Sequence, residues 1–218
     1  MRSDHKLIEK TIAFVKTELA GAEGGHDWFH TERVYKTAMT LAKEEQADQQ
    51  IVALAALLHD IADSKFHNGD ESIGPRKAQQ FLEENDLETA RIDQVVNIIK
   101  HMSFKNSLES NDYDSLEMRV VQDADRLDGM GAIGVARCFN YGGFKNRAIY
   151  DPAIQPNLNM TKEEYKKSAA PTINHFYEKL LLLKDMMHTK TGRQMAAGRH
   201  AFMESFLSQF YQEWEGEL

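Results

Sequence analysis

The sequence is poor in cysteine and proline: Cys138 is its single cysteine, and four prolines are spread over 218 residues. One cysteine excludes an internal disulfide and a thiolate metal cluster, and it is typical of a reducing compartment. The longest purely apolar run, residues 51–58, is far shorter than a membrane span, and the charged N-terminus lacks the apolar core of a signal peptide. We therefore expect a cytoplasmic protein that does not insert into membranes.

Positive charge is in the minority, because 26 lysines and arginines stand against 34 aspartates and glutamates, for a formal net charge of −8. On average such a surface repels the nucleic-acid backbone, so we expect no stable binding of DNA or RNA. A phosphorylated ligand would need a local group of cations. The composition is compatible with a homo-oligomer.

What the sequence does contain is a helical apolar period along most of its length. Hydrophobic residues make up 42% of the chain, enough for a substantial core, and they recur at intervals of three and four without strand-like alternation. This pattern predicts an all-α fold. The periodic segments predict helices within residues 4–20, 27–42, 48–63, 75–85, 92–102, 115–127, 161–187 and 195–214.

Local signals support several helix starts and one long connection. Asp27, Asp48 and Ser115 are suited to cap the helices that follow them, and Thr161 with Glu164 forms a capping box. Residues 141–160 show no periodicity and hold two of the four prolines. An irregular stretch of this length favours a loop or lid over a functional site.

Two histidines and several aspartates form a pattern suited to a metal centre. His59 and Asp60 directly follow the apolar run 51–58, where unpaired charge would be costly to bury and a cation would compensate it. Together with His30 and a late aspartate from the segment DADRLD, they supply two imidazoles and two carboxylates. This set suits a borderline-to-hard divalent cation and leaves coordination positions for water and substrate.

Four strings carry a resemblance to a known family: GHDWFHTERV, LLHDIADSKF, VVQDADRLDGMGAIGVAR and HFYEKLLLLKDMM. They resemble the HD superfamily of metal-dependent phosphohydrolases, in particular a bacterial subfamily of small HD hydrolases, over nearly the whole chain. The resemblance implies a single-domain HD-fold helical bundle over residues 1–218. Its metal-binding core is expected at about 26–130, with C-terminal helices at about 161–215 packing on that core.

The late aspartate has three alternatives, Asp123, Asp125 and Asp128, of which the last two share a helical face. The resemblance favours Asp125. The implied metal ligands are therefore His30, His59, Asp60 and Asp125. Mn²⁺ is the favoured cation, and Mg²⁺, Fe²⁺, Co²⁺, Ni²⁺ and Zn²⁺ are alternatives.

The resemblance implies hydrolysis of a phosphate ester or anhydride by metal-activated water, with a nucleotide as substrate. The favoured reaction is cleavage of a (d)NTP to the monophosphate and pyrophosphate. The enzymatic alternatives are a 5′-nucleotidase and a phosphodiesterase acting on a cyclic nucleotide or a dinucleotide. An alternative of another class is a regulatory HD module that binds a nucleotide without cleaving it.

Three residues are candidates for catalysis beside the metal. Asp63, three positions after Asp60 and expected on the same helical face, is a candidate general acid or base, as an acidic residue at the corresponding place is in some HD hydrolases. Lys65 and Arg126 lie within a few positions of proposed ligands and are candidates for stabilising phosphate charge. For Asp63 the alternative is a solvated carboxylate near a helix end.

Other side chains are candidates for substrate binding. Arg33 either contacts phosphate or forms a structural ion pair, and His101 either contacts phosphate or is favoured by the helix dipole alone. Asp128 is a candidate substrate contact. Lys145 and Arg147 would grip a polyphosphate as the loop closes, unless the loop binds no ligand. His26 is a candidate orienting partner for a ligating histidine. All six positions are read from the sequence.

Overall fold

The computed structural model describes residues 2–21, 27–62, 70, 72–102, 113–161, 164 and 168–217. Over these ranges the regular secondary structure is helical and contains no strand, which confirms the all-α prediction. The chain divides into two compact units, Met1–Asp125 and Arg126–Leu218. The expected packing of the C-terminal helices on the metal-binding core stays a prediction.

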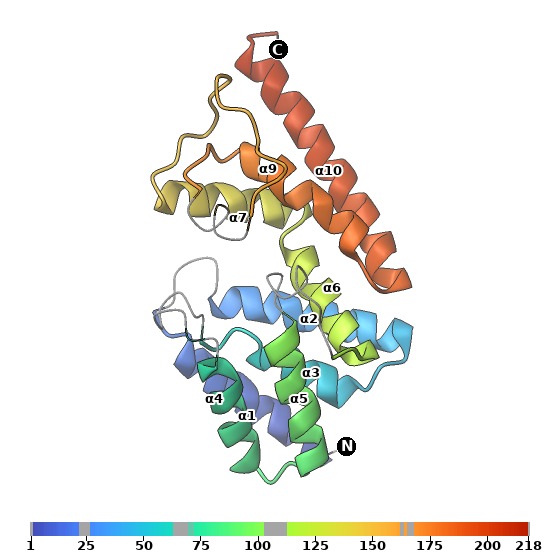
Figure 1. Cartoon of the computed structure of the whole chain (residues 1–218). Coiled ribbons are helices and arrows are strands. Elements are labelled where there is room, and N and C mark those ends of the chain that lie inside the picture. The colour runs from blue at the N-terminus through green and yellow to red at the C-terminus, as the bar shows by residue number, and fades with distance from the viewer. Residues whose placement is uncertain are drawn as a thin grey trace. The chain divides into compact units, whose positions relative to one another are not determined.

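The first unit is built around one apolar helix. It comprises α1 (Arg2–Glu18), α2 (Trp28–Glu45), α3 (Gln49–Leu58), α4 (Ile73–Glu83), α5 (Thr89–His101) and most of α6 (Leu116–Asp128). Every residue from Ile51 to Leu58 of α3 is at most 2% exposed. Helices α1, α2 and α5 pack against α3, as Figure 1 shows. The predicted core helix is therefore confirmed, and burial of its apolar side chains is the main stabilising term of this unit.

Side-chain caps define where the helices of this unit begin. The carboxylate of Asp27 accepts a hydrogen bond from the backbone N–H of His30 at 2.9 Å, and Asp48 caps α3 through two backbone N–H groups. The hydroxyl of Ser115 accepts from the N–H of Met118 at 3.1 Å. All three predicted caps are confirmed, and each is worth about 1 kcal/mol.

One helix boundary differs from the sequence prediction. Helix α3 ends at Leu58, and His59 is its C-cap, whereas the apolar pattern predicted a helix to residue 63. His59 and Asp60, which come directly after Leu58, form a turn and are not part of the core helix. The helix thus stops before Asp60, and the expected shared helical face of Asp60 and Asp63 stays a prediction. Asp63 itself lies outside the described residues.

The second unit contains α7 (Gly131–Phe144), α9 (Asn174–Glu178), the 3-10 helix η3 (Leu180–Met186) and α10 (Lys190–Trp214). Its α10 buries Met203 and Leu207, and the ring of Phe206 stacks on Phe176 with centroids 5.7 Å apart. One face of this helix thus contributes to the core of the unit, and Trp214 at its end is 47% exposed. Helix α7 runs to Phe144, so the irregular stretch begins later than the predicted residue 141. Whether this stretch acts as a lid stays a prediction.

The remaining local predictions of the second unit also have counterparts. Thr161 and Glu164 exchange reciprocal hydrogen bonds, which confirms the capping box.

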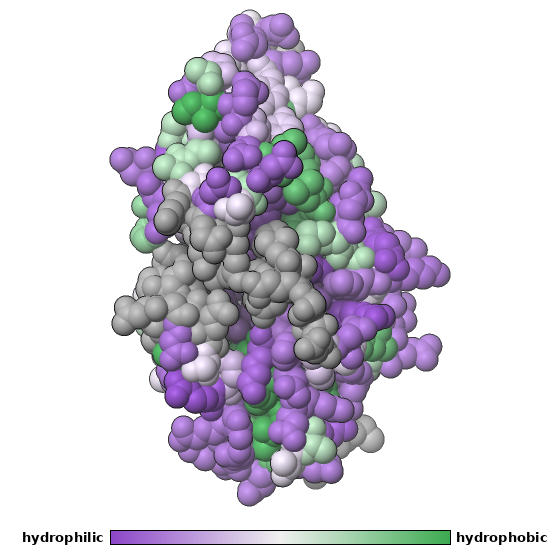
Figure 2. Space-filling view, in the orientation of Figure 1, coloured by the Kyte–Doolittle hydropathy of each residue, from purple (hydrophilic) through white to green (hydrophobic). Residues whose placement is uncertain are grey.

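On the face shown in Figure 2, hydrophilic residues predominate among those coloured, and apolar residues form small separate patches. Among the described residues, no helix is long and apolar enough to span a bilayer.

Candidate metal centre

His30 and His59 reach the candidate centre from two helix ends. The cap of Asp27 sets His30 in the first turn of α2, where its side chain is 2% exposed. His59 follows the last residue of the core helix α3, and its side chain is 6% exposed. Both imidazoles are thus held by buried structure.

The orientation of His59 follows from a backbone contact. Its Nδ1 lies 2.8 Å from the carbonyl oxygen of Ala56. Because a carbonyl only accepts hydrogen bonds, the neutral imidazole carries its proton on Nδ1 and presents the lone pair of Nε2. Backbone carbonyls commonly orient ligating histidines in this way.

The two aspartates approach these imidazoles closely. Oδ1 of Asp125 lies 3.5 Å from Nε2 of His30 and 3.9 Å from Nε2 of His59. Oδ2 of Asp60 lies 3.9 Å from Nε2 of His30. Ligand atoms of His30, His59 and Asp60 all lie within 4.8 Å of one another.

These distances can be tested against the size of a metal ion. Ligand atoms about 2.1 Å from a shared ion lie between about 3 and 4.2 Å apart, for adjacent and opposite positions. The separations of 3.5 and 3.9 Å fall in this interval and exceed a normal N–H···O hydrogen bond. The donor atoms of His30, His59 and Asp60 therefore suit a divalent cation, and Asp125 lies close enough to both imidazoles to be a fourth ligand.

Burial is uneven around the centre. His30 and His59 are nearly inaccessible, Asp60 is 17% exposed and Asp125 is 39% exposed. The centre is thus closed at the histidines and accessible at Asp125.

The neighbouring aspartates have different surroundings. Asp123 is fully buried, and Asp128 pairs with Arg137 in the second unit, with 2.6 Å between Oδ2 and the guanidinium nitrogen. Asp125 is the member of the DADRLD segment that approaches both imidazoles.

The other predicted site residues fall into three groups. Asp63, Lys65 and His26 lie outside the described residues. Arg33 is half-buried on α2, one turn after His30. His101 ends α5, and its ring stacks on Tyr113 with centroids 5.7 Å apart.

The third group belongs to the second unit, and its charges have structural contacts. Arg126 is 7% exposed and donates to the carbonyl of Met186 at 2.5 Å, and its role toward phosphate stays a prediction. Lys145 lies 5.0 Å from the ring centre of Phe144. Arg147 donates to the carbonyl of Ser168 at 2.5 Å.

Two residues that contact predicted site residues were not predicted from the sequence. The carbonyl of Ala56 orients His59, and a backbone acceptor leaves no signal in residue identity beyond its spacing of three. Arg137 pairs with Asp128 at a buried position, although an arginine in a helix is usually solvated. In the sequence, Gly129, Gly131 and Gly134 indicate that a close helix contact is possible near Arg137.

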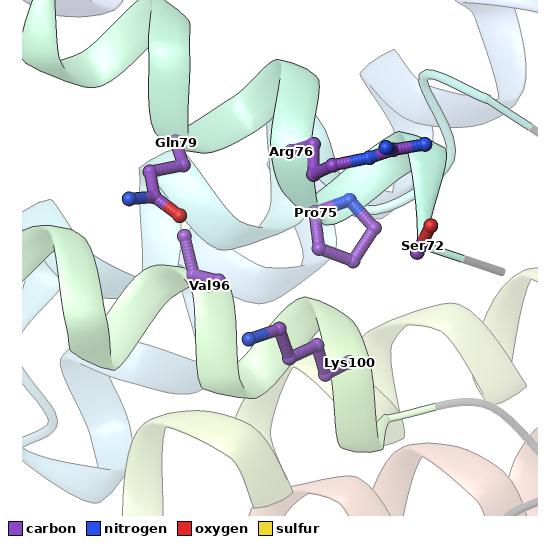
Figure 3. A pocket seen from close by; sticks show the side chains of 6 residues that line it. All are labelled: Ser72, Pro75, Arg76, Gln79, Val96 and Lys100. Atoms are coloured by element: carbon purple, nitrogen blue, oxygen red, sulfur yellow. The ribbon is translucent and has the colours of Figure 1, made fainter.

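A separate hollow of about 400 Å³ lies between α4 and α5 (Figure 3). Its lining consists of Ser72, Pro75, Arg76, Gln79, Val96 and Lys100. None of the four candidate ligands lines it. Arg76 is paired with the exposed Asp70 at 3.4 Å, as expected for a solvated surface cation.

Comparisons with known proteins identify the family. The family model for the HD domain matches residues 28–130, a range that contains all four candidate ligands. The uncharacterised protein YpgQ of Bacillus subtilis is 35% identical over 212 residues, covering 97% of this chain and 95% of YpgQ.

Solved structures extend the likeness to the fold. A protein from Lactobacillus plantarum superposes with a TM-score of 0.84 at 38% identity, covering 96% of this chain and 97% of that one. An HD-superfamily hydrolase from Bacillus thuringiensis gives 0.78 at 44% identity, covering 97% and 98%. YpgQ, solved in complex with ADP, gives 0.77 at 32% identity, covering 97% and 96%. The chain therefore belongs to the HD superfamily and is a metal-dependent phosphohydrolase.

Proposed function

We propose that this phosphohydrolase cleaves a (d)NTP to the nucleoside monophosphate and pyrophosphate, using one divalent cation bound by His30, His59, Asp60 and Asp125. The observation that carries the proposal is the approach of the Asp125 carboxylate to both imidazoles, at 3.5 and 3.9 Å. Support for a nucleotide comes from YpgQ, which was solved with ADP.

In this reaction an oxygen of water attacks the α-phosphorus, and the bond to the bridging oxygen of pyrophosphate breaks. A bound divalent cation would lower the pKa of the attacking water and offset charge on the phosphates. The chain's own contribution is positional. The hydrogen bond from Nδ1 of His59 to the Ala56 carbonyl places the lone pair of the neutral imidazole on Nε2, and burial of His30 closes one side to bulk water.

Further residues are proposed to act in proton transfer, in phosphate binding and in orienting a ligand. Asp63 is the proposed general acid or base, and Lys65 is the proposed contact for the negative charge of the leaving pyrophosphate. Arg33 and His101 are proposed phosphate contacts of the first unit, and His26 is proposed to orient a ligating histidine. Lys145 and Arg147 are proposed polyphosphate contacts of the second unit.

The metal proposed is Mn²⁺. Imidazole and carboxylate together suit borderline-to-hard cations, and thiolates, which would favour softer ions, do not take part. Mg²⁺, Fe²⁺, Co²⁺, Ni²⁺ and Zn²⁺ are compatible with subsets of the same ligands. A cytoplasmic location and a homo-oligomer remain predictions.

The reaction is tested by incubating the purified protein with a panel of nucleotides and each metal, and separating the products by chromatography. Pyrophosphate with a monophosphate supports the proposal. Orthophosphate and nucleoside released from a nucleoside monophosphate instead identify a 5′-nucleotidase, and a linear product from a cyclic nucleotide or dinucleotide identifies a phosphodiesterase. Tight nucleotide binding by metal-loaded protein without turnover contradicts catalysis and identifies a regulatory module.

A further inference from the structure

We propose that Arg137 is a positioning residue for the metal centre, because it anchors the helix end that carries Asp125. The proposal rests on the proposed role of Asp125 as a metal ligand. Arg137 is paired with Asp128, three residues after Asp125 on the same helix, and acts on Asp125 through that carboxylate.

The starting observation is the place of Asp125 in α6. The helix runs continuously from Leu116 to Asp128, so Asp125 lies in its last turn. The last turn of a helix lacks part of its backbone hydrogen bonding and frays unless other groups hold it. A ligand in this turn needs an anchor, since metal binding depends on accurately placed donor atoms.

Three successive residues after Asp125 supply that anchor. The guanidinium of Arg126 donates to the carbonyl of Met186 in η3 at 2.5 Å. The carbonyl of Leu127 accepts a hydrogen bond from Arg199 of α10. The carboxylate of Asp128 accepts from Arg137 of α7 at 2.6 Å. The helix end is thus tied to three different elements of the second unit.

Burial makes the Asp128–Arg137 pair the strongest of these ties. The side chain of Asp128 is 5% exposed and that of Arg137 is 22% exposed. Water therefore screens the pair weakly, and loss of Arg137 would remove a close hydrogen-bonded countercharge from the buried Asp128 carboxylate. By contrast, the ion pair between Arg119 and Asp114 at the other end of α6 is 47% and 56% exposed.

Glycines bring Arg137 within reach of Asp128. Gly131 adopts a positive φ of 67°, which allows the sharp turn from α6 into α7. A Cβ on Gly134 would lie 2.3 Å from the carbonyl oxygen of Gly129, so α7 approaches the end of α6 as closely as backbone allows. Arg137 lies three residues after Gly134, on the same helical face.

The test measures Mn²⁺ affinity by calorimetry in the full chain, with no nucleotide present. The variants are Arg137→Gln, Arg137→Lys, Arg199→Met and Asp125→Ala, with Arg119→Gln as the matched control that breaks the exposed pair on the same helix. Circular dichroism and thermal unfolding of each metal-free variant report whether it is folded.

We expect Arg137→Gln to lower Mn²⁺ affinity about 10-fold while remaining folded, in line with the effects of groups behind metal ligands. Arg137→Lys, which keeps a cation, should recover most of the affinity, and Arg119→Gln should match the unmodified protein. Should Arg137→Gln fail to fold, Arg199→Met decides the matter with the same expected direction, because it removes the hydrogen bond to the Leu127 carbonyl and a positive charge that acts on Asp128.

Unchanged affinity in folded Arg137→Gln overturns the inference, as does unchanged affinity in Arg199→Met where that variant decides. The proposed function fails separately, when Asp125→Ala binds Mn²⁺ as the unmodified protein does. Reduced affinity in Asp125→Ala with normal affinity in Arg137→Gln rejects only the positioning role.

Discussion

The Nδ1 atom of His59 lies 2.8 Å from the carbonyl oxygen of Ala56, one turn earlier in the chain. The end of the core helix thereby selects the tautomer whose Nε2 faces Asp125, 3.9 Å away. A backbone carbonyl therefore orients the metal-binding nitrogen Nε2 of His59. This relationship explains why a histidine directly after a fully apolar helix is suited to metal binding.

Replacing Asp125 with alanine should lower Mn²⁺ affinity by at least about 100-fold, because loss of a ligand should exceed the effect of losing an outer contact. Calorimetric titration measures the affinity. Asp114→Ala is the matched control, since Asp114 precedes the same helix and is 56% exposed. Full Mn²⁺ affinity in Asp125→Ala would show that another group completes the centre.

Replacing Gly134 with alanine should destabilise the protein by about 1–3 kcal/mol, because the added Cβ would overlap the carbonyl oxygen of Gly129. Gly198→Ala is the control: its Cβ meets nothing within 4 Å inside α10, so about 0.5–1 kcal/mol of stabilisation is expected. Thermal unfolding measures both changes. Equal effects of the two substitutions would contradict the close approach of α7 to the end of α6.

His175 should make the stability of the metal-free protein depend on pH. Burial, with the nearby charges of Lys179 and Arg147, lowers its pKa from 6.5 to about 3. Between these two values the unfolded chain binds a proton that the folded chain does not. The contribution of His175 is therefore present above pH 6.5 and is lost as the pH falls toward 3, by up to about 1.4 kcal/mol per pH unit.

Urea unfolding of the protein and of His175→Gln at pH 7, 6, 5 and 4 isolates this contribution from other titrating groups. The stability difference between the two proteins should shrink on acidification. A difference that is constant with pH would mean that His175 is protonated equally in the folded and unfolded chains.

Cys138 should resist thiol reagents in the folded protein. Its side chain is buried, and burial raises the pKa of the thiol to about 12, so the reactive thiolate is scarce at neutral pH. Labelling with an aromatic disulfide should be slow in buffer and rapid in denaturant. Equal rates in the two conditions would contradict the burial of this residue.

Much of the first unit follows from sequence because its signals are local. The caps at Asp27, Asp48 and Ser115 and the apolar run of α3 specify helix starts and the core helix without reference to distant residues. The close approach of His30, His59, Asp60 and Asp125 was likewise expected, from the likeness of their motifs to the HD superfamily.

What the sequence did not reveal depends on distant partners. The end of α3 at Leu58 was missed because the apolar period continues to Ile61. The partners of Arg126 and Asp128, Met186 and Arg137, are separated from them by 60 and 9 residues. A charge near a predicted ligand resembles a substrate contact until such partners are known.

The most direct test of the four-ligand centre is a crystal structure of the protein soaked with Mn²⁺, read by anomalous scattering. We expect an anomalous peak within about 2.3 Å of Nε2 of His30 and His59 and of carboxylate oxygens of Asp60 and Asp125. A peak elsewhere, or an ion at the histidines that Asp125 does not contact, would contradict it.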